Sequence, residues 1–261
     1  MRSASALLVE RHGGDVLEAT LARPDSYNAI NAELRDRLIE LFTSAERHGA
    51  RAILLTGQGN GFCAGVDLKS VGSAGGFATT RTMRESTQRL VTAFLECPVP
   101  VVAAVHGATA GIGLTLALGA DVCVAADDAR LVPAFLQRGI VPDGALAHIL
   151  PRLMGMARAK SFLLRGAEMS AKQAVAAGAI AECVPLADLR DHARNLAREL
   201  AELPTVQASL LKEMLSRSFS DDVAATLSSE RIAQGLASTT EDAAEGRRAF
   251  VERRTPVFRG F

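Results

Sequence analysis

The chain has 261 residues, of which 48% are hydrophobic and 22% are charged. This composition is typical of a globular protein and excludes a wholly disordered one. Lys plus Arg and Asp plus Glu both number 29, so the formal net charge is zero. Proteins that bind nucleic acids or acidic membranes usually carry an excess of basic residues, so we expect neither as a partner. At this length we expect one or two domains.

Targeting segments and metal sites are also not expected. No apolar run reaches the roughly 18 residues that span a bilayer, and residues 1–11 lack the apolar stretch of a signal peptide. The cysteines show no CxxC pair and no metal-ligand spacing with histidine; they are Cys63, Cys97, Cys123 and Cys183. Such thiols are typical of a reducing compartment, so we expect a cytoplasmic protein without a metal.

The first third of the chain predicts two strands, a helix and a buried strand. Residues 6–10 and 15–22 read as strands on either side of a turn at 12–14. A helix is expected over 31–48, with Asn31 as its N-cap and leucines at helical spacing. The short apolar run 52–56, ended by Gly57, predicts a buried strand. A further helix is expected at about 79–96.

The pattern then repeats before it changes character. A strand is expected at 99–105, a helix at 111–118 and another strand at 121–126. This alternation favours an α/β fold with mostly parallel strands. After residue 186 only helices are expected, over 188–202, 205–217, 221–237 and 241–253. We therefore divide the chain into a core, 1–195, and a helical C-terminal segment, 196–261.

Two glycine-rich segments each follow a predicted strand. Residues 61–69 read GFCAGVDLK, and residues 105–114 read VHGATAGIGL. Glycine lets a backbone approach a ligand closely, and main-chain N–H groups at such turns bind negatively charged oxygen. The alternative for the first segment is a plain strand-to-helix turn. The second lacks the full GxGxxG pattern and its later acidic residue, which excludes dinucleotide binding.

Taken together, these segments resemble the enoyl-CoA hydratase/isomerase (crotonase) family. The resemblance extends along nearly the whole chain and includes RP at 23–24, NA at 28–29, VPDG at 141–144, LPRLMG at 150–155, AVAAG at 174–178, EG at 245–246 and RRTPVF at 253–258. It implies a crotonase-like spiral of repeated ββα units, assembled as a homotrimer or a dimer of trimers. It also implies that two backbone amides, transferred by position to Ala64 and Ile112, hold a thioester oxygen. The coenzyme A thioester is then the substrate, and no cofactor is expected.

The resemblance also indicates which acid or base is present. Hydratases of the family use two glutamates, and the corresponding positions here are Thr115 and Phe135. Neither side chain transfers protons at a useful pKa, which argues against an efficient hydratase. Asp143 is the carboxylate that remains, and apolar neighbours should raise its pKa. The alternative is that Asp143 only caps the helix beginning near Ala145.

The resemblance further implies where coenzyme A binds. The adenine and pantetheine are expected against residues 27–29 and the first glycine turn, and Arg23 is a candidate for phosphate contact. The expected contacts are Arg23, Asn28, Ala29, Ala64, Val66, Asp67, Leu68 and Gly111, with Phe258 and Arg259 from the C-terminal tail. Arg253 and Arg254 belong to the same tail, for which the alternative is a solvated basic segment.

The sequence thus favours an enoyl-CoA isomerase that uses Asp143. A low-activity hydratase is the alternative within the family. A non-catalytic acyl-CoA-binding protein is the alternative from another class.

Overall fold

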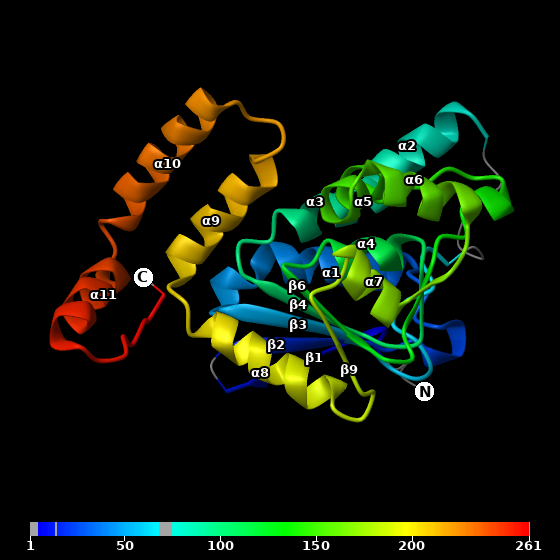
Figure 1. The fold of residues 1–261 in the computed structure, drawn as a ribbon. Helices are drawn as coiled ribbons and strands as arrows, with labels where there is room; N and C mark the ends of the chain where they lie inside the picture. The colour runs from blue at the N-terminus through cyan, green and yellow to red at the C-terminus, as the bar shows by residue number, and fades with distance from the viewer. Residues whose placement is uncertain (1–4, 14, 68–74, 261) are drawn as a thin grey trace.

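The computed structural model describes residues 5–13, 15–67 and 75–260 of the chain. Sheets and helices form a layered core, and three helices near the C-terminus form an arm on one side of it (Figure 1). The arm consists of α9 (Thr205–Arg217), α10 (Val223–Ala237) and α11 (Glu241–Glu252). The expected α/β class, and the absence of strands after residue 186, are confirmed for the described residues.

A six-stranded sheet lies at the centre of the core. Its order is β1-β2-β3-β4-β6-β9, with β1 antiparallel to β2 and every other pair parallel. Parallel strands covered on both faces are apolar throughout, as in β3 and β4. The strands are β1 (Leu7–His12), β2 (Val16–Leu21), β3 (Ala52–Gly57), β4 (Val101–Val105), β6 (Val122–Ala126) and β9 (Glu182–Val184).

A second, three-stranded sheet was not expected from the sequence. Its strands are β5 (Ala108–Ala110), β7 (Arg130–Val132) and β8 (Met169–Ser170), in that order. They are only two or three residues long, too short to show an alternating pattern. The sheet places β5 directly before α4 (Ile112–Leu118), and so positions the second glycine turn.

Helices cover both faces of the large sheet. Leu34, Leu38 and Phe42 of α1 pack on the face that carries Ile53 and Leu55, whereas α8 packs on the opposite face against Leu54 and its neighbours. The core helices are α1 (Ala32–Ser44), α2 (Phe77–Glu85), α3 (Thr87–Leu95), α5 (Leu146–Met154), α6 (Met156–Arg165), α7 (Ala171–Ala177) and α8 (Leu189–Ala201). Short 3₁₀ turns occupy Pro24–Ser26, Glu46–His48 and Leu136–Arg138.

Two local expectations can be compared with the observed helices. Asn31 caps α1 as predicted, because its side chain accepts a hydrogen bond from Leu34 N at 2.9 Å. The single helix expected over 79–96 is wrong, since α2 and α3 are separated at Ser86 by a non-helical backbone (φ −119°, ψ −85°).

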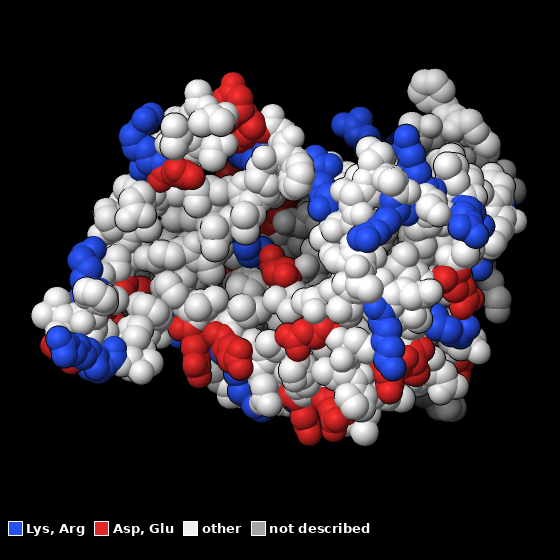
Figure 2. All heavy atoms as spheres, viewed as in Figure 1, with Lys and Arg blue, Asp and Glu red and all other residues white. Residues whose placement is uncertain are grey.

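The arm is joined to the core by hydrogen bonds from basic side chains. Lys212 of α9 donates to the Asp121 carboxylate at 2.6 Å and to the Val99 carbonyl at 2.8 Å. Arg51 donates to the carbonyls of Leu203 and Phe258, each at 2.9 Å. A hollow lies between the arm and the core on the face in Figure 2, where acidic and basic side chains are interspersed. The boundary expected at residue 195 falls inside α8, a helix that packs on the sheet.

A buried carboxylate also ties α8 to the sheet. Glu18 of β2 is only 1% exposed and accepts hydrogen bonds from Arg190 at 2.8 Å and from Arg194 at 2.7 Å. Burial raises the pKa of this carboxyl, but the two guanidinium groups outweigh burial and hold it below its usual value. A carboxyl with a lowered pKa stabilises the fold above its unfolded-state pKa, and that stabilisation is lost as the pH falls through the folded-state value.

We therefore expect Glu18→Gln to destabilise the protein. The amide keeps the shape but loses the charge-assisted hydrogen bonds, so the free energy of unfolding should fall by about 1.5–3 kcal/mol, as measured by urea denaturation at pH 7. Glu182→Gln is the matched control, because Glu182 contacts His192 of α8 but its side chain is 45% exposed. Its effect should stay within about 0.5 kcal/mol. Equal losses in the two variants would contradict the role assigned to Glu18.

Candidate active site

The two glycine turns lie side by side at the ends of β3 and β4. Gly61 pairs with Gly107, and Cys63 pairs with Thr109. Phe62 N donates to the His106 carbonyl, and Ala110 N donates to the Cys63 carbonyl, both at 2.9 Å. Two segments far apart in sequence are thereby held in a fixed register.

Glycine is required where the two turns touch. Gly65 and Gly111 both have positive φ, +97° and +55°. A Cβ on either residue would lie 3.1 Å from the Cα of the other. Larger residues at these two positions would separate the turns.

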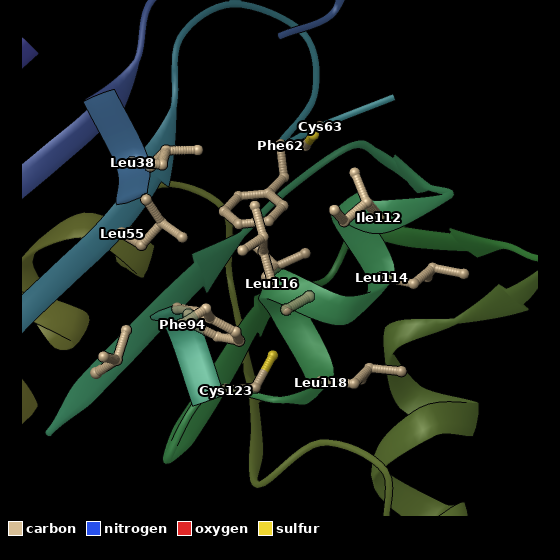
Figure 3. Close-up of a cluster of buried hydrophobic side chains, with 14 of the residues drawn as sticks. Leu38, Leu55, Phe62, Cys63, Phe94, Ile112, Leu114, Leu116, Leu118 and Cys123 are labelled. Atoms are coloured by element: carbon tan, nitrogen blue, oxygen red, sulfur yellow. The ribbon is translucent and has the colours of Figure 1, made fainter. Parts of the chain in front are cut away.

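The interior also anchors the first turn. Phe62 is fully buried and points into the hydrophobic cluster shared with Leu55 of β3 and Leu116 of α4 (Figure 3). Asn28 holds the same turn from the other side, since its amide donates to the carbonyls of Gln58 at 2.8 Å and Gly61 at 2.9 Å.

Ala64, expected to supply one of the two amides, does not offer a free donor. Its N–H donates to the Tyr27 carbonyl at 2.9 Å. Val66 pairs with Ile30 through a parallel bridge, in which Ile30 N bonds to Gly65 O and Asp67 N bonds to Ile30 O. In this bridge Ile30 supplies both the N–H and the carbonyl, which bond to Gly65 and Asp67 on either side of Val66. The N–H of Val66 itself therefore points away from Ile30. Among the described residues it has no partner. The expectation for Ala64 therefore does not fit the structure, in which the N–H of this turn without a partner is that of Val66.

Ile112 has a comparable N–H group on the second turn. It is the first residue of α4, and the first N–H groups of a helix have no partner within the helix. No other described residue accepts a hydrogen bond from it. The Ile112 N–H is therefore available to a ligand, and its role as a donor to the thioester oxygen stays a prediction.

One small cavity contains both turns and the predicted carboxylate. Its volume is about 50 Å³. The lining consists of Ala64, Gly65, Val66, Ala110, Gly111, Ile112, Ala134, Phe135, Arg138, Ile140 and Asp143. The cavity thus brings residues of both glycine turns together with one titratable carboxylate in a mostly apolar lining.

Asp143 is half-buried and does not cap α5. That helix begins at Leu146 after Ala145, and no described side chain accepts a hydrogen bond from the N–H groups of its first turn. The capping alternative is therefore wrong. Burial raises the pKa of the Asp143 carboxyl, and the residue's own N–H opposes part of this rise. No other described residue forms a hydrogen bond or ion pair with its carboxylate. Asp143 therefore holds a proton more readily than an exposed aspartate does, which favours a role in proton transfer.

Phe135 and Thr115 stand at the two positions where the resemblance places the glutamates of hydratases. Phe135 is 3% exposed and forms part of the cavity wall. Thr115 is fully buried, and its hydroxyl donates to the Gly144 carbonyl at 2.7 Å. Asp143 is thus the single carboxylate in the lining of this cavity.

Several expected coenzyme A contacts are already bonded within the chain. Arg23 pairs with Asp67 at 2.8 Å and also donates to the Ala29 carbonyl. Asn28 is fully buried, so its side chain cannot contact a ligand as expected. Tyr27 is 55% exposed beside them and remains accessible. Leu68 lies outside the described residues.

The C-terminal tail lies on the arm and does not line the cavity. Arg259 N and Gly260 N donate to the Asp242 carboxylate of α11 at 2.7 and 2.8 Å, and Arg254 pairs with Glu245. In Figure 1 the C-terminus lies between α11 and the start of α9. Within one chain, Phe258 and Arg259 therefore do not reach the Asp143 cavity.

Sequence reasoning missed Arg138, which lines the cavity. A lone arginine in a segment without helical or strand periodicity carries no sequence signal of its own. Cys63 lies beside the first turn, but burial raises the pKa of its thiol to about 12, so it is not a nucleophile at neutral pH.

Metal and membrane sites can be assessed only for residues 5–13, 15–67 and 75–260. In this part of the chain, no three His, Cys, Asp or Glu side chains gather as metal ligands. No described helix has the length and hydropathy to cross a bilayer.

The chain is similar to known proteins along nearly its whole length. Residues 11–260 match the family model for enoyl-CoA hydratase/isomerase. A Rhodobacter capsulatus protein named a probable enoyl-CoA hydratase is 41% identical over 241 residues, 92% of this chain and 93% of that protein. The 1,2-epoxyphenylacetyl-CoA isomerase of Escherichia coli is 39% identical over 253 residues, 94% of this chain and 95% of that protein.

Solved structures show the same fold. The crystal structure of an enoyl-CoA hydratase from Bacillus anthracis superposes with a TM-score of 0.90 at 30% identity, and covers 98% of this chain and 100% of that one. The expected crotonase-like fold is therefore confirmed. Since the family model spans nearly the whole sequence and the relatives match over nearly their full lengths, the chain belongs to the enoyl-CoA hydratase/isomerase family.

Proposed function

We propose that this chain is an acyl-CoA isomerase in which Asp143 moves a proton along the acyl chain. The observation that carries the proposal is one cavity lined by Val66, Ile112 and a single carboxylate, where the N–H groups of Val66 and Ile112 have no partner among the described residues. In this proposal the coenzyme A thioester is the substrate and not a cofactor. We also propose that the protein acts in the cytoplasm. The relative that isomerises 1,2-epoxyphenylacetyl-CoA supports isomerase chemistry, and the relatives named as hydratases support the family's acyl-CoA chemistry.

The proposed reaction needs only these groups. The N–H groups of Val66 and Ile112 donate to the thioester oxygen, and each such donor is worth roughly 3 kcal/mol as negative charge develops there. The Asp143 carboxylate takes a proton from C2 of a 3-enoyl thioester, and the electron pair moves to the oxygen as a dienolate. The protonated Asp143 then returns the proton to C4. The double bond ends between C2 and C3, conjugated with the thioester.

Hydration is disfavoured by the same lining. Adding water across a double bond needs a group that activates water and a group that protonates carbon, and Phe135 supplies neither. We expect crotonyl-CoA hydration far below the median enzyme turnover of about 10 per second. Loss of conjugated-thioester absorbance measures it directly, and a rate near that median would establish the hydratase alternative.

Asp143→Asn tests the proton shuttle. Asparagine keeps the shape but cannot accept the proton, so isomerisation of a 3-enoyl-CoA should fall by about 10²–10⁴-fold. Binding of the thioester and the melting temperature should change little, because the Asp143 side chain has no described partner to lose. The gain of conjugated-thioester absorbance gives the rate, and calorimetry gives the affinity. Asp36→Asn, an exposed change on α1, is the control.

The pH profile provides a second readout of the same variant. Asp143 must be ionised to act as a base, and burial raises its pKa. The wild-type rate should therefore fall on acidification at a pH above the ordinary aspartate value of about 3.9, and this limb should vanish in Asp143→Asn. An unchanged rate in the variant would remove Asp143 from the reaction. Tight binding by a wild type that isomerises no enoyl-CoA would favour the non-catalytic acyl-CoA-binding protein.

We further propose that the arm assembles a homotrimer or a dimer of trimers. Exposed apolar side chains along the arm support this, and they include Leu211, Leu215, Phe219, Leu227, Ile232 and Leu236. Assembly is also the means by which Phe258 and Arg259 could reach coenzyme A in a neighbouring subunit. Light scattering at micromolar concentration should give three or six times the 27.5 kDa chain mass. A strictly monomeric species would contradict the proposal.

A further inference from the structure

The turn that carries Asp143 has an unusual backbone. Gly144 and Ala145 both lie in the left-handed region, with φ of +67° and +64°. Glycine adopts this conformation readily, but alanine does not. Such residues persist only where the surrounding structure holds them, and they cluster at functional sites.

Thr115 holds this turn from α4. Its side chain is fully buried, and its hydroxyl donates to the Gly144 carbonyl at 2.7 Å. The approach is close, since a Cβ added to Gly144 would collide with the Thr115 hydroxyl oxygen. α4 begins at Ile112, so Thr115 lies one helical turn beyond a proposed oxyanion donor, on the same face. The helix α4 therefore carries one proposed oxyanion donor, Ile112, and through Thr115 also contacts the turn of the proposed base.

The Asp143 carboxylate has no side-chain partner among the described residues that could orient it. Its place in the cavity is therefore set by the backbone of residues 143–145. We infer that Thr115 is a positioning residue, which aims the Asp143 carboxylate at the thioester by fixing the Gly144 carbonyl; this inference rests on the proposed function of Asp143. Thr115, which stands where hydratases of the family carry a glutamate, then serves the reaction by orienting Asp143.

The test compares Thr115→Val with Thr115→Ser. Valine keeps the volume and removes the donor, whereas serine keeps the donor and removes a methyl group. In Thr115→Val we expect kcat to fall about 10–100-fold, because a misplacement of about 1 Å can cost that much, while KM stays within about threefold. Thr115→Ser should keep at least about a third of the wild-type kcat. Thr56→Val is the matched control, because Thr56 is a buried threonine of β3 that bonds a main-chain carbonyl away from the cavity.

Crystal structures of the wild type and Thr115→Val give a readout that needs no activity. The turn at 143–145 should shift in Thr115→Val and stay in place in Thr56→Val. Unchanged kcat and an unmoved turn in Thr115→Val would overturn the inference while leaving the proposed function intact. Equal kcat losses in Thr115→Val and Thr115→Ser would also overturn it, because the hydroxyl would then not be the feature that matters. If the wild type isomerises no enoyl-CoA, the proposed function fails, and an unmoved turn in Thr115→Val would overturn the positioning role as well.

Discussion

The backbone pairing of the two glycine turns is the constraint on which the rest of the site depends. Phe62 and Ala110 each donate a main-chain hydrogen bond to the other turn, and Gly65 touches Gly111 with no room for a side chain. Val66 and Ile112 each follow one of these glycines directly. The relative placement of their N–H groups is therefore set by main-chain geometry and not by side-chain rotamers, as preorganised stabilisation of an oxyanion requires.

This constraint separates the binding of the thioester oxygen from the choice of proton-transfer group. A backbone donor survives almost any substitution of its own side chain, so valine and isoleucine can occupy these positions. The rest of the cavity lining is free to carry a carboxylate or an apolar residue, and here it includes Phe135 and Asp143. The family can thus change its chemistry at a few positions without rebuilding the fold, and family membership by itself does not decide the reaction.

The sequence predicted most clearly those elements whose signal is local. The buried strand β3, the capped helix α1 and the strand-free C-terminal region show continuous apolar runs, a cap or a helical period. The strands β5, β7 and β8 could not be predicted, because they are defined by tertiary pairing and not by a pattern. The same holds in the site: the motifs located both turns and Asp143, but the choice of Val66 over Ala64 follows from a bridge to Ile30. Arg23 and Asn28 were expected at coenzyme A from the resemblance alone, and nothing in the sequence indicated the bonds they form within the chain to Asp67, Gln58 and Gly61.

Glu18 and Asp143 show how different environments move the pKa of a carboxyl in opposite directions. Glu18 is nearly inaccessible, and two guanidinium groups more than offset the cost of its burial, so it stays ionised and ties α8 to the sheet. Asp143 is less buried but has no cationic partner among the described residues, so burial alone raises its pKa. A proton shuttle has to exist in both charge states, and a carboxylate with a raised pKa is better suited to this than one whose charged form two cations stabilise. An arginine bonded to Asp143 would fix its position but would also lower its pKa. A hydrogen bond from a neutral side-chain hydroxyl to a main-chain carbonyl, such as that from Thr115 to Gly144, can fix the position without that electrostatic effect.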